Sequence, residues 1–453
     1  MTDMVKLADV ETELRESLER GYSARARAIL ADMHPADIAD LLDVMDEDHR
    51  LQAFSLLEDE IASEVLDETQ AEATLDLLEA VPDERLADLL EELPMDDAAE
   101  LLGDLPPAQA ESLIALMEPE EAAEVRGLLE YSDETAGRLM TEKVVRIRRR
   151  WTAQETIEYL RHIDSETETL AYLYVVDDND RLVGVVPLRD LITAPANTLI
   201  RDVMEPDVIS VTVDTDQEEV ARLVAKYDFF AIPVADRAGR LAGIITHDDV
   251  VDILEEEFTE DVHRLGGSQP LERPYFALSI PQVVRKRAGW LLLLFATGGL
   301  MSGAVMRYFE AELATMVALG AFIPLVTGTG GNAGSQTVAT VIRALALEDV
   351  RTGDLLRVLV REVIAGLGVG VMLGIIGMAL ALFWETGPHL GWTFTLTLVA
   401  VCVWANVFGA LIPIIADRVG IDPAVVSTPF ITTVVDATGL FIYFSLAKVI
   451  LGI

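Results

Sequence analysis

The stretch PAVVSTPFITTVVDATGLFIYFSLA (423–447) is long and apolar enough to cross a membrane as one helix, and Asp436 is its one charged residue. A carboxylate at this depth costs about 3 kcal/mol on insertion scales, so an ion or proton site is the default interpretation. Thr428 and Thr432 precede Asp436 at intervals of four, which places all three on one helix face. The alternative, an aspartate neutralised inside the bundle, is disfavoured because the other predicted spans offer no basic partner.

The charge of the chain is divided unequally between its two parts. Residues 281–453 contain ten acidic and ten basic side chains, so residues 1–280 hold the whole formal net charge of −43. Leu, Ala, Val and Ile still recur regularly in this acidic part, which therefore has the apolar residues to form packed cores. The acidity argues against nucleic acid and anionic lipid as its partners, and favours cations.

The inventory of reactive side chains argues against an enzyme and against soft metals. Cys402 is the single cysteine, and the six histidines are scattered, so any bound metal is expected to have oxygen ligands. The sequence has no P-loop and no pattern of a nucleophile with a paired histidine. The acidic N-terminus has no apolar run, and we expect no signal peptide.

Residues 1–130 consist of short helical units in tandem. LADLLEELP (86–94) and AAELLGDLP (98–106) repeat at a period of twelve, with a proline at each boundary. Each unit is too short to be stable alone, so the pattern predicts an α-superhelical domain in which neighbouring units bury one continuous face. Asp96 and Glu100 are helical neighbours whose charges repel unless a cation bridges them.

Residues 131–262 repeat on a larger scale. LMTEKVVRIRRRWTAQETIEYL (139–160) is echoed by VMEPDVISVTVDTDQEEVARLV (203–224), and each copy predicts a strand, a helix, two strands joined by a tight turn, and a second helix. The α+β pattern resembles tandem CBS domains, whose Gly-x-x-Thr-x-x-Asp signature is complete at 243–249, while Pro187 replaces the threonine in the first copy. The resemblance allows an ATP-like adenine nucleotide between the copies, a purely structural pair being the alternative. Candidate nucleotide contacts are Tyr172, Arg189, Asp190 and Phe229.

The segment 248–267, DDVVDILEEEFTEDVHRLGG, predicts a strongly acidic helix, and we expect residues 263–284 to form a helix that connects the soluble part to the membrane domain. An all-α membrane domain with five helices is predicted for residues 285–453. The expected spans are 288–306, 313–342, 363–384, 392–416 and 423–447. Basic residues cluster before the first span and between the second and third, so the positive-inside rule places the N-terminal domains in the cytoplasm and the C-terminus outside.

The second span contains a polar stripe beside several glycines. Within PLVTGTGGNAGSQTVAT (324–340), Asn332 and Gln336 are one turn apart, and Gly328 precedes them on the same face. Close helix packing accounts for the glycines but not for the polar side chains, so we favour a pore lining. Asn406 in the fourth span has no such companions and is expected to make one interhelical hydrogen bond.

The motifs GTGGNAGSQ (328–336), Asp422-Pro423 and DATG (436–439), in this domain order, resemble the MgtE family of magnesium channels along essentially the whole chain. This resemblance implies a homodimer whose pore follows the two-fold axis between the second and fifth helices, with Asp436 binding the permeating ion. It also implies that cytosolic Mg²⁺ compacts the soluble domains, so that the connecting helix at 263–284 plugs the pore. Thr428 stands where the family can have asparagine.

The resemblance further implies a set of magnesium-sensing acids in the soluble domains and connecting helix. The matching residues are Glu64, Asp96, Glu100, Asp216, Asp228, Asp248, Asp249, Asp252, Glu257, Glu260, Asp261 and Asp422. The expected function is thus a Mg²⁺-selective channel of the cell's inner membrane. The main alternative is a proton- or sodium-coupled secondary transporter. An anion channel regulated by CBS domains is disfavoured, because Asp436 would repel the permeating anion. A further alternative is a membrane sensor that conducts no ions.

Overall fold

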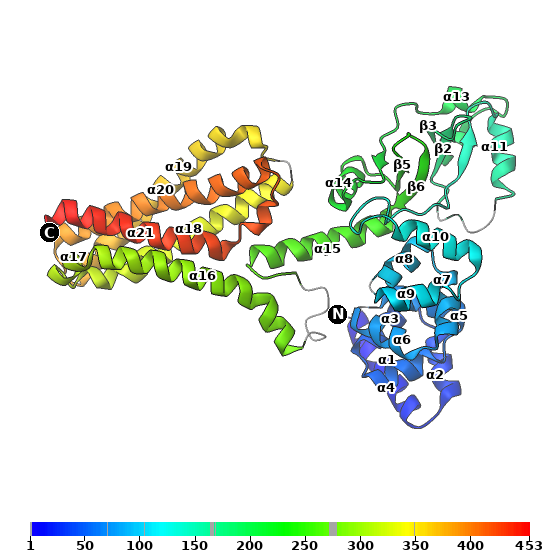
Figure 1. Ribbon diagram of the computed structural model, residues 1–453, viewed down its shortest axis with the longest axis horizontal. Coiled ribbons are helices and arrows are strands. Elements are labelled where there is room, and N and C mark those ends of the chain that lie inside the picture. Colours follow the sequence, from blue (N-terminus) through cyan, green and yellow to red (C-terminus); the bar gives the residue numbers. More distant parts are fainter. Residues whose placement is uncertain are drawn as a thin grey trace. The chain divides into compact units, whose positions relative to one another are not determined.

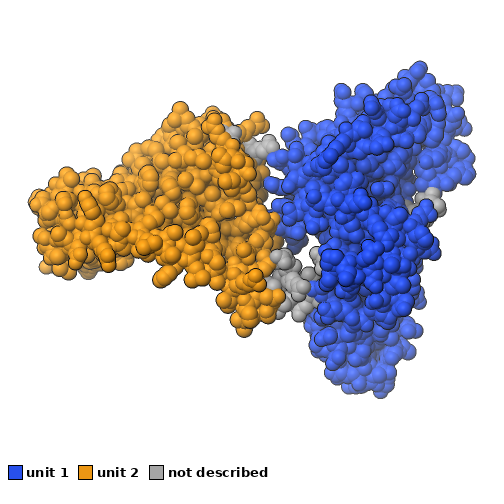
Figure 2. Space-filling view, viewed as in Figure 1, with its two compact units in different colours: residues 1–257 blue, residues 258–453 orange. Residues whose placement is uncertain are grey.

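The computed structural model describes residues 2–453 except 70, 104, 164–166, 168, 271–278 and 348. The chain divides into two compact units, Met1–Glu257 and Phe258–Ile453, coloured blue and orange in Figure 2. The first unit holds a helical domain followed by two small sheets with their helices, and the second is helical. The predicted fold class is confirmed.

The N-terminal domain is a series of short helices (Figure 1). Their bounds are α1 Thr2–Glu19, α2 Ser23–Leu30, α3 Pro35–Val44, α4 Glu47–Phe54, α5 Asp59–Glu68, α6 Ala71–Ala80, α7 Asp83–Glu92, α8 Met95–Gly103, α9 Pro107–Ile114 and α10 Pro119–Leu129. Proline is the first residue of α3, α9 and α10. An N–H at this position would have no acceptor within the helix, so proline costs no helical hydrogen bond there. Alternate helices pack together, α3 on α5, α5 on α7 and α7 on α9.

The next part contains two three-stranded sheets with the predicted order of elements. The first copy comprises β1 Arg146–Arg148, α11 Ala153–Leu160, β2 Tyr172–Val176, β3 Leu182–Pro187 and α12 Leu188–Thr193. The second comprises α13 Ile200–Val203, β4 Val211–Thr212, α14 Gln217–Tyr227, β5 Ala231–Ala235, β6 Leu241–Thr246 and α15 His247–Leu265. In both sheets the first pair of strands is parallel and the second antiparallel.

The two copies exchange backbone contacts. Thr141, ahead of the first copy, pairs with Ile244 of β6, and Glu205, ahead of β4, pairs with Val185 of β3. Gly243 permits the first contact, because a Cβ there would lie 2.4 Å from the carbonyl oxygen of Thr141. The glycine of the signature motif is therefore required by packing between the copies.

The connecting segment differs from the prediction. The helix expected at 263–284 ends at Leu265, and residues 266–270 are not helical. Gly267 has a φ of +74°, a left-handed conformation that glycine adopts without steric cost and that ends the helix. The acidic helix α15 thus lies earlier in the chain than the predicted plug, and residues 271–278 of that prediction are outside the described residues.

The second unit is a bundle of long helices. The elements are α16 Ile280–Tyr308, α17 Glu310–Thr315, α18 Leu319–Ala346, η1 Thr352–Asp354, α19 Leu355–Phe383, α20 Pro388–Arg418, η2 Pro423–Val425 and α21 Thr428–Leu451. Over the part of the chain that the structure describes, four helices are long and apolar enough to cross a membrane, namely α16, α19, α20 and α21. α18 is also 28 residues long but is not among them, and its sequence contains several glycines and a polar stripe.

Several helix boundaries differ from the predicted spans: α16 begins at Ile280 and not at 288, and α21 begins at Thr428 and not at 423. α18 begins at Leu319 and not at 313, because residues 310–315 form the separate helix α17. α19 begins at Leu355, eight residues before the predicted span, and so includes Glu362 within its first three turns. The predicted span began at residue 363 because it was defined by apolar content, and Glu362 is the last charged residue before the apolar run.

Glycines allow the long helices to approach closely. α18 packs against both α20 and α21, and the three helices lie side by side in Figure 1. A Cβ at Gly409 of α20 would lie 2.8 Å from the carbonyl oxygen of Gly334 in α18. In membranes, where lipid is as apolar as the helices, such small-residue contacts supply much of the packing.

We predict that Gly409→Val separates α18 from α20 and lowers thermal stability. Overpacking costs about 1–3 kcal/mol, which for a domain of this size corresponds to a midpoint lower by about 3–10 °C. The measurement is the unfolding midpoint of the detergent-solubilised protein by fluorescence-detected chromatography. Gly299→Val is the matched control, because a Cβ at Gly299 of α16 would have no protein atom within 4 Å. Equal midpoints for the two variants would contradict this packing.

Candidate ion-binding sites

Asp436 lies on α21 and faces a glycine of α18. A Cβ at Gly331 would be 3.2 Å from Oδ1 of Asp436 and 2.8 Å from Cγ2 of Thr432. Oδ1 of Asp436 is buried, and no donor among the described residues bonds to it. The site therefore combines a buried carboxylate oxygen that has no hydrogen-bond donor among the described residues with a neighbouring helix that has no side chain at the point of contact.

A hydroxyl pair joins the two helices one turn from Asp436. Oγ of Ser335 on α18 lies 3.0 Å from Oγ1 of Thr432. The Thr432 hydroxyl donates to the carbonyl of Thr428, at 3.0 Å, so Ser335 supplies the proton in the pair. Thr432 thus has a structural bond on each side, and Thr428 contributes its carbonyl.

The predicted polar stripe of α18 is exposed in the single chain. Gly328, Asn332 and Gln336 are all solvent-accessible, as is Thr340. They therefore lie on a different part of the helix surface from the buried Gly331. Amide side chains on an apolar membrane helix need polar partners, which lipid cannot supply.

Three carboxylates meet in the first unit. Asp96 and Asp97 of α8 and Asp249 of α15 each offer an oxygen within 4.8 Å of the others. All three belong to the first turn of their helix, where the helix dipole stabilises negative charge. Asp249 is oriented by Thr246, which donates its N–H at 3.0 Å and its hydroxyl at 2.7 Å. An all-oxygen donor set of this kind suits Mg²⁺ or Ca²⁺.

The electrostatics of this cluster disfavour three simultaneous negative charges. Burial, followed by repulsion from Asp67 and Asp96, raises the pKa of Asp97 to about 10. Burial, with the charges of Glu68 and Asp252, raises the pKa of Asp67 to about 6. Burial also raises the pKa of Asp249. At neutral pH the cluster must therefore take up protons or a cation.

The structure brings together only some of the predicted sensing acids. Asp96 and Asp249 meet, and the charge of Asp252 acts on neighbouring Asp67. Asp97 and Asp67 were missed, although Asp97 follows Asp96 directly and was detectable as a second acid in the same first turn. Of the predicted sensing acids, those that are exposed outside the three-carboxylate cluster are Glu64, Glu100, Asp216, Asp228, Asp248 and Asp252.

Two predicted sensing acids have ordinary structural partners. Asp216 caps α14 by accepting a bond from the N–H of Glu218 at 3.0 Å. Glu257 accepts a bond from Nε2 of Gln217 at 2.7 Å. Asp228 ends the same helix α14 in a left-handed conformation, with φ of 53°.

At the junction of α15 with the membrane helices, an arginine stands among the predicted metal ligands. Arg264 pairs with Asp422 at 2.7 Å and also with Glu260. Asp422 is held from its other oxygen by the N–H of Ala424, at 2.7 Å. Burial and the charge of Asp422 raise the pKa of Asp261, against the opposing effect of Arg264. At this point the guanidinium of Arg264 provides the positive charge. The prediction had considered only the acidic residues of this segment and did not include Arg264.

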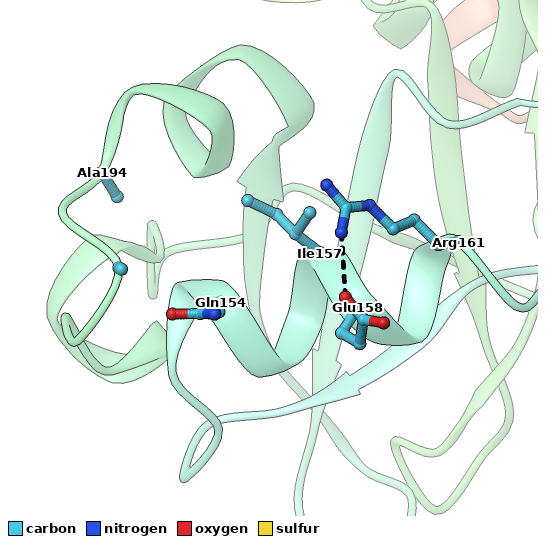
Figure 3. A pocket seen from close by; sticks show the side chains of 6 residues that line it. Gln154, Ile157, Glu158, Arg161 and Ala194 are labelled. Atoms are coloured by element: carbon cyan, nitrogen blue, oxygen red, sulfur yellow. Dashed lines mark hydrogen bonds and ion pairs between the residues drawn. The ribbon is translucent and has the colours of Figure 1, made fainter.

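The proposed nucleotide contacts lie partly together. The rings of Tyr172 and Phe229 meet edge to face with centroids 6.4 Å apart. Arg189 is exposed and bonds to Asp190 at 3.1 Å. A hollow of about 240 Å³ lies elsewhere, between α11 and the residues after α12 (Figure 3). The four predicted contacts are not among its lining residues, which are Gln154, Ile157, Glu158, Arg161, Ala194 and Ala196.

Comparison with known proteins covers the chain from end to end. Residues 33–134 match the model of the MgtE intracellular N domain, 136–197 and 200–256 match CBS domains, and 323–446 match a divalent cation transporter model named MgtE. A protein of Thermus thermophilus named magnesium transporter MgtE is 39% identical over 444 residues, covering 97% of this chain and 98% of the relative. The chain belongs to the MgtE family.

Other members of the MgtE family agree with this assignment. The magnesium transporter MgtE of Enterococcus faecalis is 38% identical over 321 residues, which are 70% of this chain and 69% of the relative. A solved structure of the cytosolic domain of the Mg²⁺ channel MgtE in complex with ATP superposes with a TM-score of 0.51 at 41% identity. It covers 54% of this chain and 99% of the solved chain.

We predict that Asp97→Asn stabilises the protein when divalent cations are absent and reduces its stabilisation by Mg²⁺. In the folded cluster Asp97 must be protonated or bound to a cation at neutral pH, and removing that requirement is expected to contribute about 1–3 kcal/mol, allowing for partial exposure. The measurement is the rate at which a protease cuts residues 1–257 of the intact protein, with EDTA and with Mg²⁺. Slower cutting in EDTA and a smaller effect of Mg²⁺ are expected.

Asp88→Asn is the control for this substitution, because Asp88 is an exposed acid on α7 of the same domain. It should leave both cutting rates unchanged. Faster cutting of the Asp97→Asn protein in EDTA, or an undiminished effect of Mg²⁺, would show that the three carboxylates do not act as a unit.

Proposed function

We propose that this chain is a Mg²⁺ channel of the inner membrane and that the ion passes beside Asp436. The observation that carries the proposal is the buried Oδ1 of Asp436, which has no hydrogen-bond donor among the described residues and faces Gly331. Both residues fall within 323–446, the segment matched to divalent cation transporters. The family relatives named above are magnesium transporters, which favours Mg²⁺ over other divalent ions as the cargo.

The chemistry of the site suits a hydrated dication. Mg²⁺ keeps several of its waters and is usually held through one or two carboxylates. Asp436 accepts the protons of such waters, and the amides of Asn332 and Gln336 can do so along the exposed face of α18. Thr428 and Gly328 are proposed to line the same passage, although the Thr428 carbonyl itself accepts the hydroxyl of Thr432.

We propose a homodimer with two copies of Asp436 at its axis. One chain supplies one negative charge at this site, and two supply the charge that one Mg²⁺ neutralises. A monovalent ion would leave half of it uncompensated, in surroundings where like charges repel strongly. The exposed stripe of Asn332 and Gln336 supports this assembly, because a second chain or a water-filled pore would keep it away from lipid.

The acidic first unit is proposed to sense cytosolic Mg²⁺. A cation held by Asp96, Asp97 and Asp249 joins α8 of the helical domain to α15, which follows the second sheet. The ion binds the compact arrangement of the domains more tightly than the open one and so favours the compact state. When the ion is lost, the three carboxylates repel each other. Compaction is proposed to close the pore through α15. The N-terminal domains are then cytoplasmic and the C-terminus is outside.

The tandem CBS part is proposed to bind ATP, as the related cytosolic domain does. Tyr172 and Phe229 provide aromatic surfaces for a base, and Arg189 is exposed and available to phosphate. Asp190, which now accepts a bond from Arg189, would accept hydroxyl protons of a ribose.

We predict that Asp436→Asn lowers Mg²⁺ influx by at least about tenfold, because the isosteric amide removes the charge that offsets the ion's lost hydration. Purified protein in liposomes that contain a Mg²⁺ dye gives the measurement. Glu385→Gln removes an exposed acid from the loop between α19 and α20 and should leave influx unchanged. Wild-type influx through the Asp436→Asn protein would refute the site.

The same liposomes distinguish a channel from a coupled transporter. With the voltage clamped by valinomycin and potassium, influx through a channel continues when the proton and sodium gradients are removed. Influx that stops when either gradient is removed would favour the secondary transporter.

A further inference from the structure

Glu362 is an acidic residue inside the membrane domain that the sequence pattern left outside the spans. It is the eighth residue of α19, about 10 Å along the helix from its start. Its Oε2 accepts a bond from Nδ2 of Asn406 on α20, at 3.0 Å, and from the hydroxyl of Thr337 on α18, at 3.3 Å. Asn406 therefore makes the interhelical bond that the sequence predicted, and its partner is an acid.

The surroundings of Glu362 hold one carboxylate oxygen in place. Asn406 is 8% exposed and Thr337 is 6% exposed, so both donors are shielded from water. Among the described residues, Glu362 has hydrogen bonds from neutral donors but no ion pair with a basic side chain. An acid kept at this position without a counter-charge calls for a role, because intramembrane acids are costly and rarely incidental.

The bonds to Glu362 fix α18 on the side away from Asp436. At this point α18 and α20 are in close contact, since a Cβ at Gly409 would lie 3.2 Å from Cβ of Thr337 and 2.8 Å from the oxygen of Gly334. On the other side, Ser335 bonds to Thr432. Hydrogen bonds thus hold α18 on two sides, through Thr337 to Glu362 of α19 and through Ser335 to Thr432 of α21.

We propose that Glu362 is a positioning residue for ion passage: through Thr337 it holds α18 at the separation from α21 that sets the ion site at Asp436. This inference rests on the proposed function of Asp436 and adds a residue that does not touch the ion. The carboxylate is suited to the role because a charged acceptor binds two donors more strongly than a neutral amide does. Weakening these hydrogen bonds lets Gly331 move relative to Asp436 and lowers the affinity of the site for the hydrated ion.

The test is the dependence of Mg²⁺ influx on Mg²⁺ concentration for Glu362→Gln in liposomes. Membrane hydrogen bonds of this kind correspond to about a three- to tenfold change in an equilibrium constant. We expect the half-saturating Mg²⁺ concentration to rise by about that factor. A merely structural role would reduce the number of active channels, and so the maximal influx, without shifting the half-saturating concentration.

A reciprocal double variant distinguishes the effect of the hydrogen bond between residues 362 and 406 from the effect of a negative charge at position 362. Glu362→Gln combined with Asn406→Asp exchanges donor and acceptor across the same 3.0 Å contact and should restore the half-saturating concentration to within about twofold. Thr337→Val removes one donor at nearly constant volume and serves if Glu362→Gln folds poorly; it should give a smaller shift in the same direction. Glu385→Gln is again the control.

The outcomes are distinguishable. An unchanged half-saturating concentration in both Glu362→Gln and Thr337→Val overturns the positioning role. A shift that the reciprocal variant fails to reverse also overturns it, because the charge at 362 itself would then matter. If Asp436→Asn conducts normally, the proposed ion site fails, whatever Glu362 does.

Discussion

An acid inside a membrane must be neutralised, and the architecture of this protein depends on how Asp436 meets that requirement. The carboxylate is not paired by the chain: one oxygen is buried beside Gly331 with no donor among the described residues. Glycines on α18 and α20 bring the helices so close that no side chain fills the space. We propose that a cation is the remaining partner, in the proposed dimer a hydrated Mg²⁺ between two copies of Asp436.

The same requirement is met differently at other acids in the chain. Asp422 is neutralised by Arg264 and needs no metal for its charge. Glu362 is stabilised by the neutral donors Asn406 and Thr337. The cluster of Asp96, Asp97 and Asp249 has helix N-termini in its favour but too many charges for its volume, as the raised pKa of Asp97 shows. Of these acids, Asp436 and the three-carboxylate cluster are the ones at which the proposed function places Mg²⁺.

The sequence predicts whatever depends on neighbours along the chain. Short helices with boundary prolines, the order of strands in each repeat, and the lone charge at Asp436 are all local patterns, and the first two are confirmed by the structure. Tertiary contacts were not accessible in this way. The pairing of Arg264 with Asp422 joins residues 158 positions apart, and the raised pKa of Asp97 depends on burial and on charges that include the distant Asp67 and Asp249. Glu362 was missed because apolar content, which marks a span, ends at a charged residue even when the helix continues past it.

The most direct test of the ion site is a cryo-electron microscopy map of the protein in lipid nanodiscs, recorded with Mg²⁺ and again with EDTA. The account predicts a density on a two-fold axis between two Asp436 side chains, about 4–5 Å from each carboxylate as expected for a water-mediated contact, that disappears with EDTA. A map in which Asp436 lies away from any shared axis, paired with a basic side chain or turned toward lipid, would contradict it.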